Sequence, residues 1–402
     1  EHYAICMLAC FYSGVIAVPI FPPESTRPQH LARLNGVASD ANASCVLTSR
    51  KLVETIAASG TSFGRLQTIE VDAIDPALSD AWQPFEPADE DVAFLQYTSG
   101  STSTPKGVIV THACLMANEH AMSIAFGVGP DSRYVTWAPL YHDMGLIGGL
   151  LLPLYCGIPV VLTSPRYFLE RPVRWLELIS RHRATHSGGP DFAFRLCLER
   201  TRDAQLAELD LSSWRCAYTG AEPVRADTER DFIARFAPAG LSADAAVPCY
   251  GLAEATLFVT ASPCGDGVTT RGFNADALAV GRGIPDEDGR LLVSCGVVPP
   301  EHRLLIVEPV SRAPMAAGVI GEIWFHGPSV AAGYWNNERA TQETFVERDG
   351  LRWLRTGDLG FVCEQGNLYV TGRMKDLIIV RGHNLYPQDI ERIIEEEVDA
   401  VR

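Results

Sequence analysis

The sequence predicts an α/β fold: a large N-terminal part built of β-α-β units, a small β-rich subdomain, and the start of a third unit. Two observations predict it. Up to about residue 260, short apolar runs alternate with amphipathic segments, a pattern typical of parallel sheets with helices on both faces. Beyond that point, short strand signals stand between glycines and prolines, which indicates a small β-rich domain.

Each element follows from a local pattern of apolar residues and turn residues. The strands predicted in the N-terminal part are 15–20, 44–48, 92–96, 134–137 and 159–162. The helices predicted there are 30–40 and 144–155, and a helix–strand unit runs from 173 to 186. Later strands are predicted at 303–307, 321–325 and 377–380, the last leading into an acidic helix.

These patterns divide the chain into 1–260, 261–374 and 375–402, where the third range is the start of a further unit near Lys375. The first residues are already apolar at helical spacing, and the last residues lie inside a helical pattern. We therefore expect both ends to be cut from a longer protein.

Composition narrows the class of protein. The chain has 402 residues, enough for two or three domains, with 33 basic and 49 acidic residues and a formal charge of -16. This acidic balance argues against a general nucleic-acid or anionic-membrane surface. The 11 cysteines are odd in number and form no C-x-x-C pair, which favours a reducing, cytoplasmic setting. No apolar run reaches the roughly 18 to 20 residues of a membrane span.

The strongest motif is the segment Tyr97–Val108, which follows the apolar strand 92–96. Its small residues let backbone N–H groups approach phosphate oxygens, its hydroxyls add donors, and its lysine adds charge. It is not a Walker A loop, because no Lys-Ser/Thr pair ends it. The alternative is a flexible linker. The candidate phosphate-binding residues are Thr98, Ser99, Gly100, Ser101, Thr102 and Lys106.

This loop resembles the phosphate-binding signature of the adenylate-forming superfamily, which includes acyl-CoA synthetases, luciferases and peptide-synthetase adenylation domains. Four further segments resemble family motifs in the family's order: 220–223, 250–256, 354–360 and 372–376. The resemblance implies a large adenylate-forming domain of stacked sheets, a β-barrel-like subdomain and the start of a mobile C-terminal α+β domain. It also implies ATP and Mg²⁺ as cofactors.

The resemblance assigns Gly220, Ala221 and Glu222 to the segment that flanks the adenine. In the next motif it assigns Tyr250, with Gly251 and Ala253, to adenine stacking, and Glu254 to Mg²⁺. A carboxylate is also by itself a suitable hard ligand for Mg²⁺. The alternative for Glu254 is a carboxylate at a helix start.

The last two motifs supply groups for the ribose and phosphates. The resemblance implies that Asp358 grips both ribose hydroxyls, and an ionised carboxylate accepts two such bonds. Arg373 can donate to ribose or phosphate. Lys375 adds charge near the same phosphates or is a solvated hinge residue, and Asp358 taken alone could be a turn residue.

Within the superfamily the chain is most similar to fatty acyl-AMP ligases. The segments 139–146 and 188–194 resemble that family's forms, and 272–296 resembles its insertion, which is thought to restrain the lid and disfavour CoA. Lys106 departs from the pattern, because many of these ligases have a smaller residue there. The implied substrate-binding residues are Tyr141, Asp143, Met144, Gly145, Gly189, Pro190, Asp191 and Phe192.

Three interpretations of the role of His142 are open. The resemblance makes it a gate of the acyl pocket, whereas a His-Asp pair with Asp143 could also be a catalytic dyad or a buried hydrogen-bonded pair. General-base chemistry is disfavoured, because a carboxylic acid substrate is already ionised at neutral pH. The candidate catalytic residues are His142, Glu254 and Lys375.

The resemblance implies that a fatty acid and ATP give acyl-AMP and pyrophosphate. The acyl group then passes to the phosphopantetheine of an acyl carrier protein, in polyketide, nonribosomal-peptide or lipid biosynthesis. The rivals are an acyl-CoA ligase, an amino-acid adenylation domain with Asp191 near the amine, and a non-catalytic nucleotide-binding module. The family's catalytic lysine lies beyond Arg402, so we expect this chain to form adenylate slowly.

Overall fold

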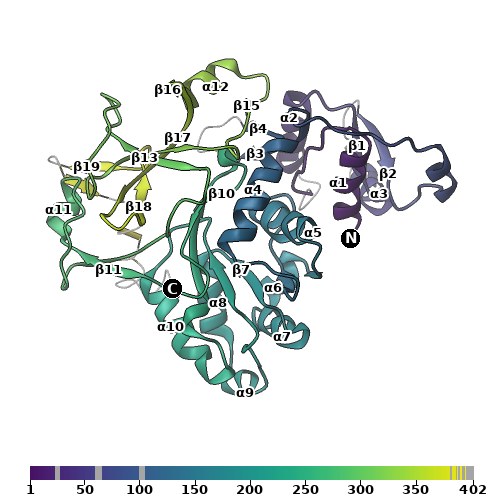
Figure 1. Ribbon diagram of the computed structural model, residues 1–402. Helices are drawn as coiled ribbons and strands as arrows, with labels where there is room; N and C mark the ends of the chain where they lie inside the picture. The colour runs from purple at the N-terminus through teal and green to yellow at the C-terminus, as the bar shows by residue number, and fades with distance from the viewer. Residues whose placement is uncertain are drawn as a thin grey trace.

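The computed structural model describes residues 1–22, 28–58, 66–98, 105–380, 383–385, 387, 390, 391 and 394. The N-terminal part lies at the right of Figure 1, the six-stranded sheet and its helices lie in the centre, and the β-rich part lies at the left. The predicted α/β class is confirmed. The three residue ranges predicted as domains stay a prediction.

The N-terminal part joins short helices to a two-stranded parallel sheet. Its elements are α1 (His2–Tyr12), α2 (Pro28–Asp40), β1 (Cys45–Thr48), α3 (Arg50–Ala58), β2 (Gln67–Glu70) and the 3-10 helix η1 (Pro76–Ala81). The strand predicted at 15–20 makes a single bridge, in which the Ala17 N–H donates to Ala93 O at 3.2 Å and Ala17 O accepts from Leu95 N at 2.9 Å. Pro19 has no N–H to extend that ladder.

A separate three-stranded antiparallel sheet holds the two ends of the Ser/Thr/Gly loop. The strands β3 (Val92–Thr98) and β4 (Lys106–Thr111) form a hairpin, and β15 (Gly333–Tyr334) pairs with the other edge of β4. Residues 99–104 of the loop lie outside the described residues. The order β15-β4-β3 therefore brings a segment more than 200 positions later in the chain beside Lys106.

The central six-stranded sheet has the order β10-β9-β8-β7-β5-β6. Its strands are β5 (Tyr134–Thr136), β6 (Val160–Leu162), β7 (His186–Gly189), β8 (Cys216–Thr219), β9 (Ala246–Gly251) and β10 (Phe258–Ala261). Five strands run parallel and β10 is antiparallel to β9, so the sheet is mixed rather than wholly parallel as the sequence predicted.

Helices cover both faces of this sheet. They are α4 (His112–Ala125), η2 (Met144–Leu151), α5 (Leu152–Tyr155), α6 (Pro165–Glu170), α7 (Val173–His182), α8 (Asp191–Arg200), α9 (Asp203–Leu206) and α10 (Ala226–Phe236). Alternate strand residues enter two different cores, as the pleat requires. Tyr134 and Tyr218 join the core that contains Met122, whereas Val135 and Ala217 join the aromatic core around Trp175.

The β-rich part contains a five-stranded antiparallel sheet of order β13-β14-β17-β16, with β18 paired to β17. The strands are β13 (Arg303–Val307), β14 (Gly321–His326), β16 (Phe345–Arg348), β17 (Leu351–Val362) and β18 (Leu368–Arg373). In the segment predicted as an insertion, β11 (Thr270–Phe273) and β12 (Arg290–Val293) form an antiparallel pair that flanks α11 (Ala275–Ala279).

The remaining elements are short. They are the 3-10 helices η3 (Ala237–Ala239), η4 (Ala243–Ala245) and η5 (Ala253–Ala255), the helix α12 (Glu338–Thr344), and the pair β19 (Ile378–Val380) and β20 (His383–Leu385). Most of the predicted acidic helix beyond residue 385 lies outside the described residues.

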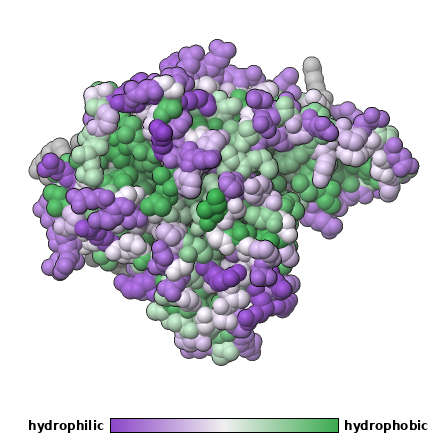
Figure 2. Space-filling model, in the orientation of Figure 1, coloured by the Kyte–Doolittle hydropathy of each residue, from purple (hydrophilic) through white to green (hydrophobic). Residues whose placement is uncertain are grey.

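Apolar side chains also remain on the surface, and Figure 2 shows apolar areas on both flanks of the molecule in this view. The exposed large apolar residues include Val280, Leu291 and Val310 in the β-rich part and Tyr12, Leu78 and Trp82 in the N-terminal part. Among the described helices, none is both long and apolar enough to cross a membrane.

Candidate active site

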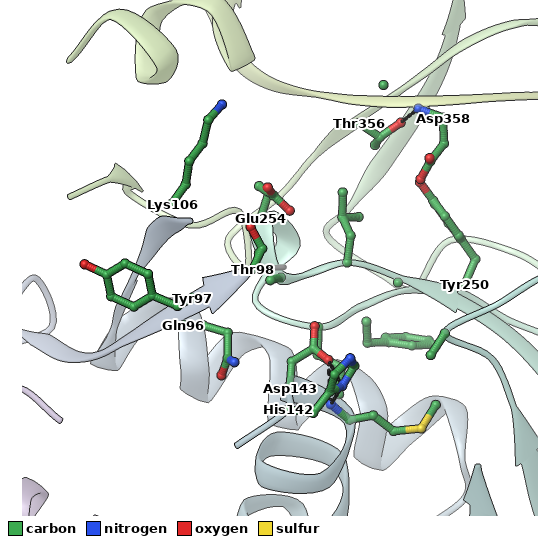
Figure 3. A pocket seen from close by; sticks show the side chains of 18 of the residues that line it. Gln96, Tyr97, Thr98, Lys106, His142, Asp143, Tyr250, Glu254, Thr356 and Asp358 are labelled. Atoms are coloured by element: carbon green, nitrogen blue, oxygen red, sulfur yellow. Dashed lines mark hydrogen bonds and ion pairs between the residues drawn. The ribbon is translucent and has the colours of Figure 1, made fainter. Parts of the chain in front are cut away.

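One cavity of about 890 Å³ collects most of the residues that the sequence singled out. Its walls come from the β3–β4 hairpin, η2, the ends of β8 and β9, η5 and the long strand β17. The predicted residues that line it are Thr98, Lys106, Tyr141, His142, Asp143, Met144, Ala221, Tyr250, Gly251, Ala253, Glu254, Asp358, Arg373 and Lys375. Figure 3 shows ten residues of this lining by name.

Other predicted residues lie outside the lining. They are Gly145, Gly189, Pro190, Asp191, Phe192, Gly220 and Glu222. Glu222 accepts a hydrogen bond from the backbone N–H of Phe192 at 2.6 Å, so these two predicted residues contact one another. Ser99, Gly100, Ser101 and Thr102 fall outside the described residues.

Asp358, Tyr250 and Arg373 form one polar end of the cavity. The Tyr250 hydroxyl donates to Asp358 Oδ2 at 2.7 Å (Figure 3). Arg373 Nε lies 3.3 Å from Asp358 Oδ1. Burial raises the pKa of Asp358, while the Tyr250 hydrogen bond and the Arg373 charge oppose that rise. Burial also holds the pKa of Tyr250 well above its ordinary value, so the phenol remains a donor.

The backbone of β17 presents Asp358 to the cavity. Gly357 has a positive φ of 71°, a conformation that glycine adopts readily, and the pairing of β14 with β17 shifts register in this part of the sheet. The Asp358 N–H donates to the Thr356 hydroxyl at 3.1 Å, and the Thr356 hydroxyl donates to Ile323 O at 2.7 Å. The carboxylate is therefore held by its own strand and by the neighbouring one.

Glu254 lies at a second polar wall, on η5, where the chain turns back from β9 to β10. A Cβ at Gly251 would meet Leu257 O at 2.0 Å, so only glycine permits this tight return. Thr256 has a positive φ of 70°, and its fully buried hydroxyl donates to Ser329 O at 2.7 Å. Thr256 therefore supports the turn, and its hydroxyl does not line the cavity.

Tyr334 holds the Glu254 carboxylate. Its hydroxyl donates to Glu254 Oε1 at 2.7 Å, and Lys106 Nζ lies 4.7 Å from the centre of the Tyr334 ring. Figure 3 places Lys106 at the end of β4 and Glu254 on the neighbouring wall. In the described part of the chain, no three His, Cys, Asp or Glu side chains form a metal cage. The Glu254 carboxylate is a suitable ligand for Mg²⁺, which is usually bound by one or two carboxylates, several waters and phosphate oxygens.

The inner wall of the cavity is apolar. Phe126 stacks on Tyr218 with ring centres 5.4 Å apart, and Phe258 meets Phe126 edge-on at 5.6 Å. Met122 adds a flexible side chain, and Gly148 on η2 adds only backbone. The cavity therefore combines an apolar wall with a few polar groups, as small-molecule sites usually do.

His142 and Asp143 lie between the polar and apolar parts. His142 Nδ1 is 2.6 Å from Asp143 Oδ1, and the charge of Asp143 raises the pKa of His142 against the opposing effect of burial. Gln96 holds the preceding residue, because its amide donates to Tyr141 O at 3.1 Å. The pair faces the cavity, so it is not a buried hydrogen-bonded pair of the core (Figure 3).

Asp191 lies outside the cavity, and its carboxylate contacts the start of α10. Its side chain is 2% exposed, and it accepts from the Arg225 N–H at 3.0 Å and from the Thr228 hydroxyl at 3.1 Å. Arg195 Nε also lies 3.4 Å away. These contacts tie α8 to the start of α10, and burial raises the pKa of Asp191 to about 6. The geometry gives Asp191 a structural role and leaves it away from the cavity.

Several lining residues were missed by sequence reasoning, above all Tyr334, Glu322 and Arg355. Glu322 is buried and accepts from Arg355 Nη2 at 3.0 Å and from Trp324 Nε1 at 2.9 Å. Arg355 and Thr356 stand inside a motif that was recognised, two or three residues before Asp358. Tyr334 had no such signal, since it reaches the site only through strand pairing.

Known proteins are similar to this chain over most of its length. A family model described as AMP-binding enzyme matches residues 1–335. The medium-chain-fatty-acid–[acyl-carrier-protein] ligase JamA of Moorena producens is 43% identical over 416 residues, covering 100% of this chain and 70% of JamA. The long-chain-fatty-acid–AMP ligase FadD26 of Mycobacterium marinum is 39% identical over 416 residues, covering 98% of this chain and 70% of FadD26.

Solved structures match over the same length. The structure of a fatty acyl-adenylate ligase from Legionella pneumophila, in complex with acyl adenylate and pyrophosphate, superimposes with a TM-score of 0.88 at 39% identity. The match covers 98% of this chain and 69% of that one. An adenylation domain of a keto acid-selecting peptide-synthetase module matches with a TM-score of 0.84 at 28% identity, covering 98% and 73% of the two chains.

Proposed function

This chain belongs to the AMP-binding enzymes, among the fatty acyl-AMP ligases, and from that premise we propose how its cavity activates a fatty acid. The reaction joins a fatty acid to ATP, giving acyl-AMP and pyrophosphate. The observation that carries the proposal is one cavity with Asp358, Arg373 and Glu254 at its polar walls and Phe126, Tyr218 and Phe258 inside it. Adenosine and phosphates would occupy the first part and the hydrocarbon chain the second.

The chemistry requires positioning more than proton transfer. A carboxylate oxygen of the acid bonds to the α-phosphorus while the bond from that phosphorus to the pyrophosphate oxygen breaks. The acid is already ionised at neutral pH, so no base is needed. The barrier comes from repulsion between anions, and placed cations and donors lower it. Arg373 and Lys375 supply positive charge at the cavity wall.

Asp358 and Tyr250 would orient the nucleotide. Asp358 accepts from the ribose hydroxyls, and its bonds to Tyr250 and Arg373 keep the carboxylate in one orientation before ATP arrives. The Tyr250 ring would stack on the adenine. His142 at the boundary between the two parts supports a gate for the acyl chain, held in place by Asp143.

Glu254 is the residue that would hold Mg²⁺, together with the phosphates of ATP. When bound, Mg²⁺ neutralises phosphate charge and withdraws electrons from the leaving pyrophosphate.

We propose an acyl carrier protein as the acceptor, through its phosphopantetheine thiol. Two relatives are named fatty-acid–[acyl-carrier-protein] ligases, and FadD26 is named an AMP ligase, which favours a carrier over free CoA. The antiparallel pair β11–β12 stands where the sequence resembles the family's insertion. The cytoplasmic setting stays a prediction.

The structure argues against the alternative hypothesis of an amino-acid adenylation domain. An amino-acid adenylation site needs an acid for the α-amine, and Asp191 is committed to Arg225, Thr228 and Arg195. The non-catalytic rival does not explain why Glu254, Asp358 and Arg373 line one cavity.

Calorimetry with a non-hydrolysable dodecanoyl-adenylate analogue tests the proposal. We expect tight binding of the analogue, weaker binding of adenosine alone, and no binding of CoA. A phenylalanyl-adenylate analogue that bound more tightly than the dodecanoyl compound would overturn the proposal in favour of amino-acid activation. Transfer of a preformed dodecanoyl adenylate to CoA in preference to a phosphopantetheinylated carrier would overturn the choice of acceptor.

A further inference from the structure

Lys106 and Tyr334 form a contact that neither the motif nor the proposed chemistry accounts for. Lys106 belongs to the Ser/Thr/Gly loop motif and was expected to touch phosphate. Its ammonium instead lies 4.7 Å from the centre of the Tyr334 ring, within the range of a cation–π contact. The same tyrosine donates to Glu254 Oε1 at 2.7 Å.

Strand pairing produces this contact. Tyr334 on β15 pairs with Val108 on β4, so Lys106 is its diagonal neighbour on the same face of the sheet. The Trp335 N–H donates to Gly107 O at 2.8 Å and fixes that register. A lysine two residues from the paired position therefore reaches the ring by sheet geometry alone.

The segment before Tyr334 is also tied to Glu254. The Ala331 N–H donates to Glu254 O at 3.0 Å, and Ser329 O accepts from the Thr256 hydroxyl. His302 Nε2 lies 2.9 Å from the Ser329 hydroxyl. These bonds join the segment just before β15 to Glu254 and Thr256 at the end of η5. The tyrosine cannot shift far without moving the turn that carries the glutamate.

The chemistry of the phenol suits a fixed donor. The Tyr334 hydroxyl is protonated at neutral pH, because the ordinary pKa of a tyrosine is about 10. A positive charge over the ring face draws electron density from the phenol and makes its O–H a better donor. A bond from an uncharged donor to a carboxylate is stronger than one between neutral groups.

We propose that Tyr334 is a positioning residue that orients Glu254 for the metal of MgATP, and that Lys106 acts on this site through the Tyr334 ring. The inference rests on the proposed function, because it takes MgATP as the ligand. Oε1 accepts from the phenol, so Oε2 is the oxygen that would be left to bind the metal. Lys106 keeps the phenol in place and strengthens its bond.

The test measures how much Mg²⁺ tightens ATP binding. Calorimetry gives the Kd of ATP with excess MgCl₂ and with EDTA, and their ratio is the Mg²⁺ enhancement. In Tyr334→Phe, which keeps the ring, we expect the enhancement to fall about tenfold, the factor that corresponds to 1.4 kcal/mol. Binding of ATP in EDTA and of the dodecanoyl-adenylate analogue, which lacks the metal-binding phosphates, should stay unchanged.

Lys106→Met then separates an indirect role from a direct one. If Lys106 acts through Tyr334, Lys106→Met lowers the enhancement in the wild-type background and has no further effect in Tyr334→Phe. If Lys106 contacts phosphate directly, it weakens ATP binding in EDTA by the same factor in both backgrounds, and the proposal fails. Tyr155→Phe, a half-exposed tyrosine outside the cavity, is the matched control.

The remaining outcomes are also decisive. A Tyr334→Phe variant with the full enhancement, or a wild-type chain with no enhancement, overturns the positioning role. If Tyr334→Phe fails to fold, as circular dichroism would show, Lys106→Met still tests the inference, since an unchanged enhancement in that variant contradicts it. Failure of the wild type to bind the adenylate analogue would instead count against the proposed function itself.

Discussion

At the scale of single residues, Asp358 depends on its neighbours for its state of charge. It is 7% exposed, and burial alone would favour the neutral acid. Tyr250 and Arg373 oppose that effect with a hydrogen bond and a positive charge. An ionised carboxylate accepts two bonds from a ribose diol, whereas a protonated one has less acceptor capacity. The three residues therefore act as one unit.

Asp358→Ala should weaken binding of the dodecanoyl-adenylate analogue by roughly tenfold to a hundredfold, because charge-assisted hydrogen bonds are worth about 1.5–3 kcal/mol. Calorimetry measures the change. Asp349→Ala, at an exposed turn between β16 and β17, is the control and should bind as the wild type does. Equal affinities of the Asp358 variant and the wild type for the analogue would show that Asp358 does not bind the ribose hydroxyls.

At the scale of elements, α4 is attached to the turn that carries Glu254. Asn118 is fully buried on α4, and its amide donates to Ala255 O at 3.2 Å and to Phe258 O at 3.1 Å. Its carbonyl accepts from the Phe258 N–H at 3.2 Å. One side chain thus satisfies three backbone groups at the ends of η5 and β10.

Asn118→Ala should lower the free energy of unfolding by about 2–4 kcal/mol, because it leaves buried backbone groups without partners. Urea denaturation followed by fluorescence measures the loss. Met116→Ala, at a half-exposed position on the same helix, should change it by less than about 1 kcal/mol. A loss no larger than that of the control would show that the turn is held by other contacts.

The helix η2 shapes the apolar interior because it presents a glycine there. Gly148 lines the cavity, and a Cβ at this position would come within 3.3 Å of Leu257 Cδ2. Any larger side chain would project into the space assigned to the hydrocarbon chain. Glycine at this position therefore leaves room inside the cavity.

Gly148→Leu should weaken binding of the dodecanoyl analogue about tenfold or more, since overpacking costs about 1–3 kcal/mol. Binding of a butanoyl analogue should stay close to wild type. Gly129→Leu is the control, because a Cβ there has no neighbour within 4 Å among the described atoms. Equal loss for the two analogues would mean that the hydrocarbon chain takes another path.

At the scale of the whole molecule, three buried carboxyl groups of the described chain that lie outside the cavity oppose stability at neutral pH. Burial raises the pKa of Glu229 from 4.5 to about 7 and that of Asp191 from 3.8 to about 6. Burial also raises the pKa of Glu119 well above its ordinary value. As the pH rises through these windows, the unfolded chain ionises first, so the folded state becomes relatively less stable.

Glu229→Gln should therefore gain stability relative to the wild type as the pH rises from about 4.5 to 8. The difference in the free energy of unfolding should grow by up to about 3 kcal/mol, the value of 2.5 pKa units. Denaturation at a series of pH values measures it. Glu208→Gln, at an exposed site, is the control. A difference for Glu229→Gln that does not change with pH would contradict the prediction.

The sequence by itself determined the fold class, and it predicted most of the residues of the cavity that are proposed to bind the nucleotide. Glu254, Asp358 and Arg373 each stand in a short motif, and each motif forms one local turn or strand end. Local spacing is enough to predict such features, because the turn and its functional side chain are adjacent in the chain. The same holds for His142 and Asp143 at the start of η2.

Only the tertiary structure decided which residues support those groups. Tyr334 reaches Glu254 through the pairing of β15 with β4. Asp191 lies outside the cavity, where it accepts hydrogen bonds from Arg225 and Thr228. The sequence also could not show that β10 reverses direction at the edge of the sheet. These outcomes depend on pairings between segments far apart in the chain, where periodicity and motif spacing carry no information.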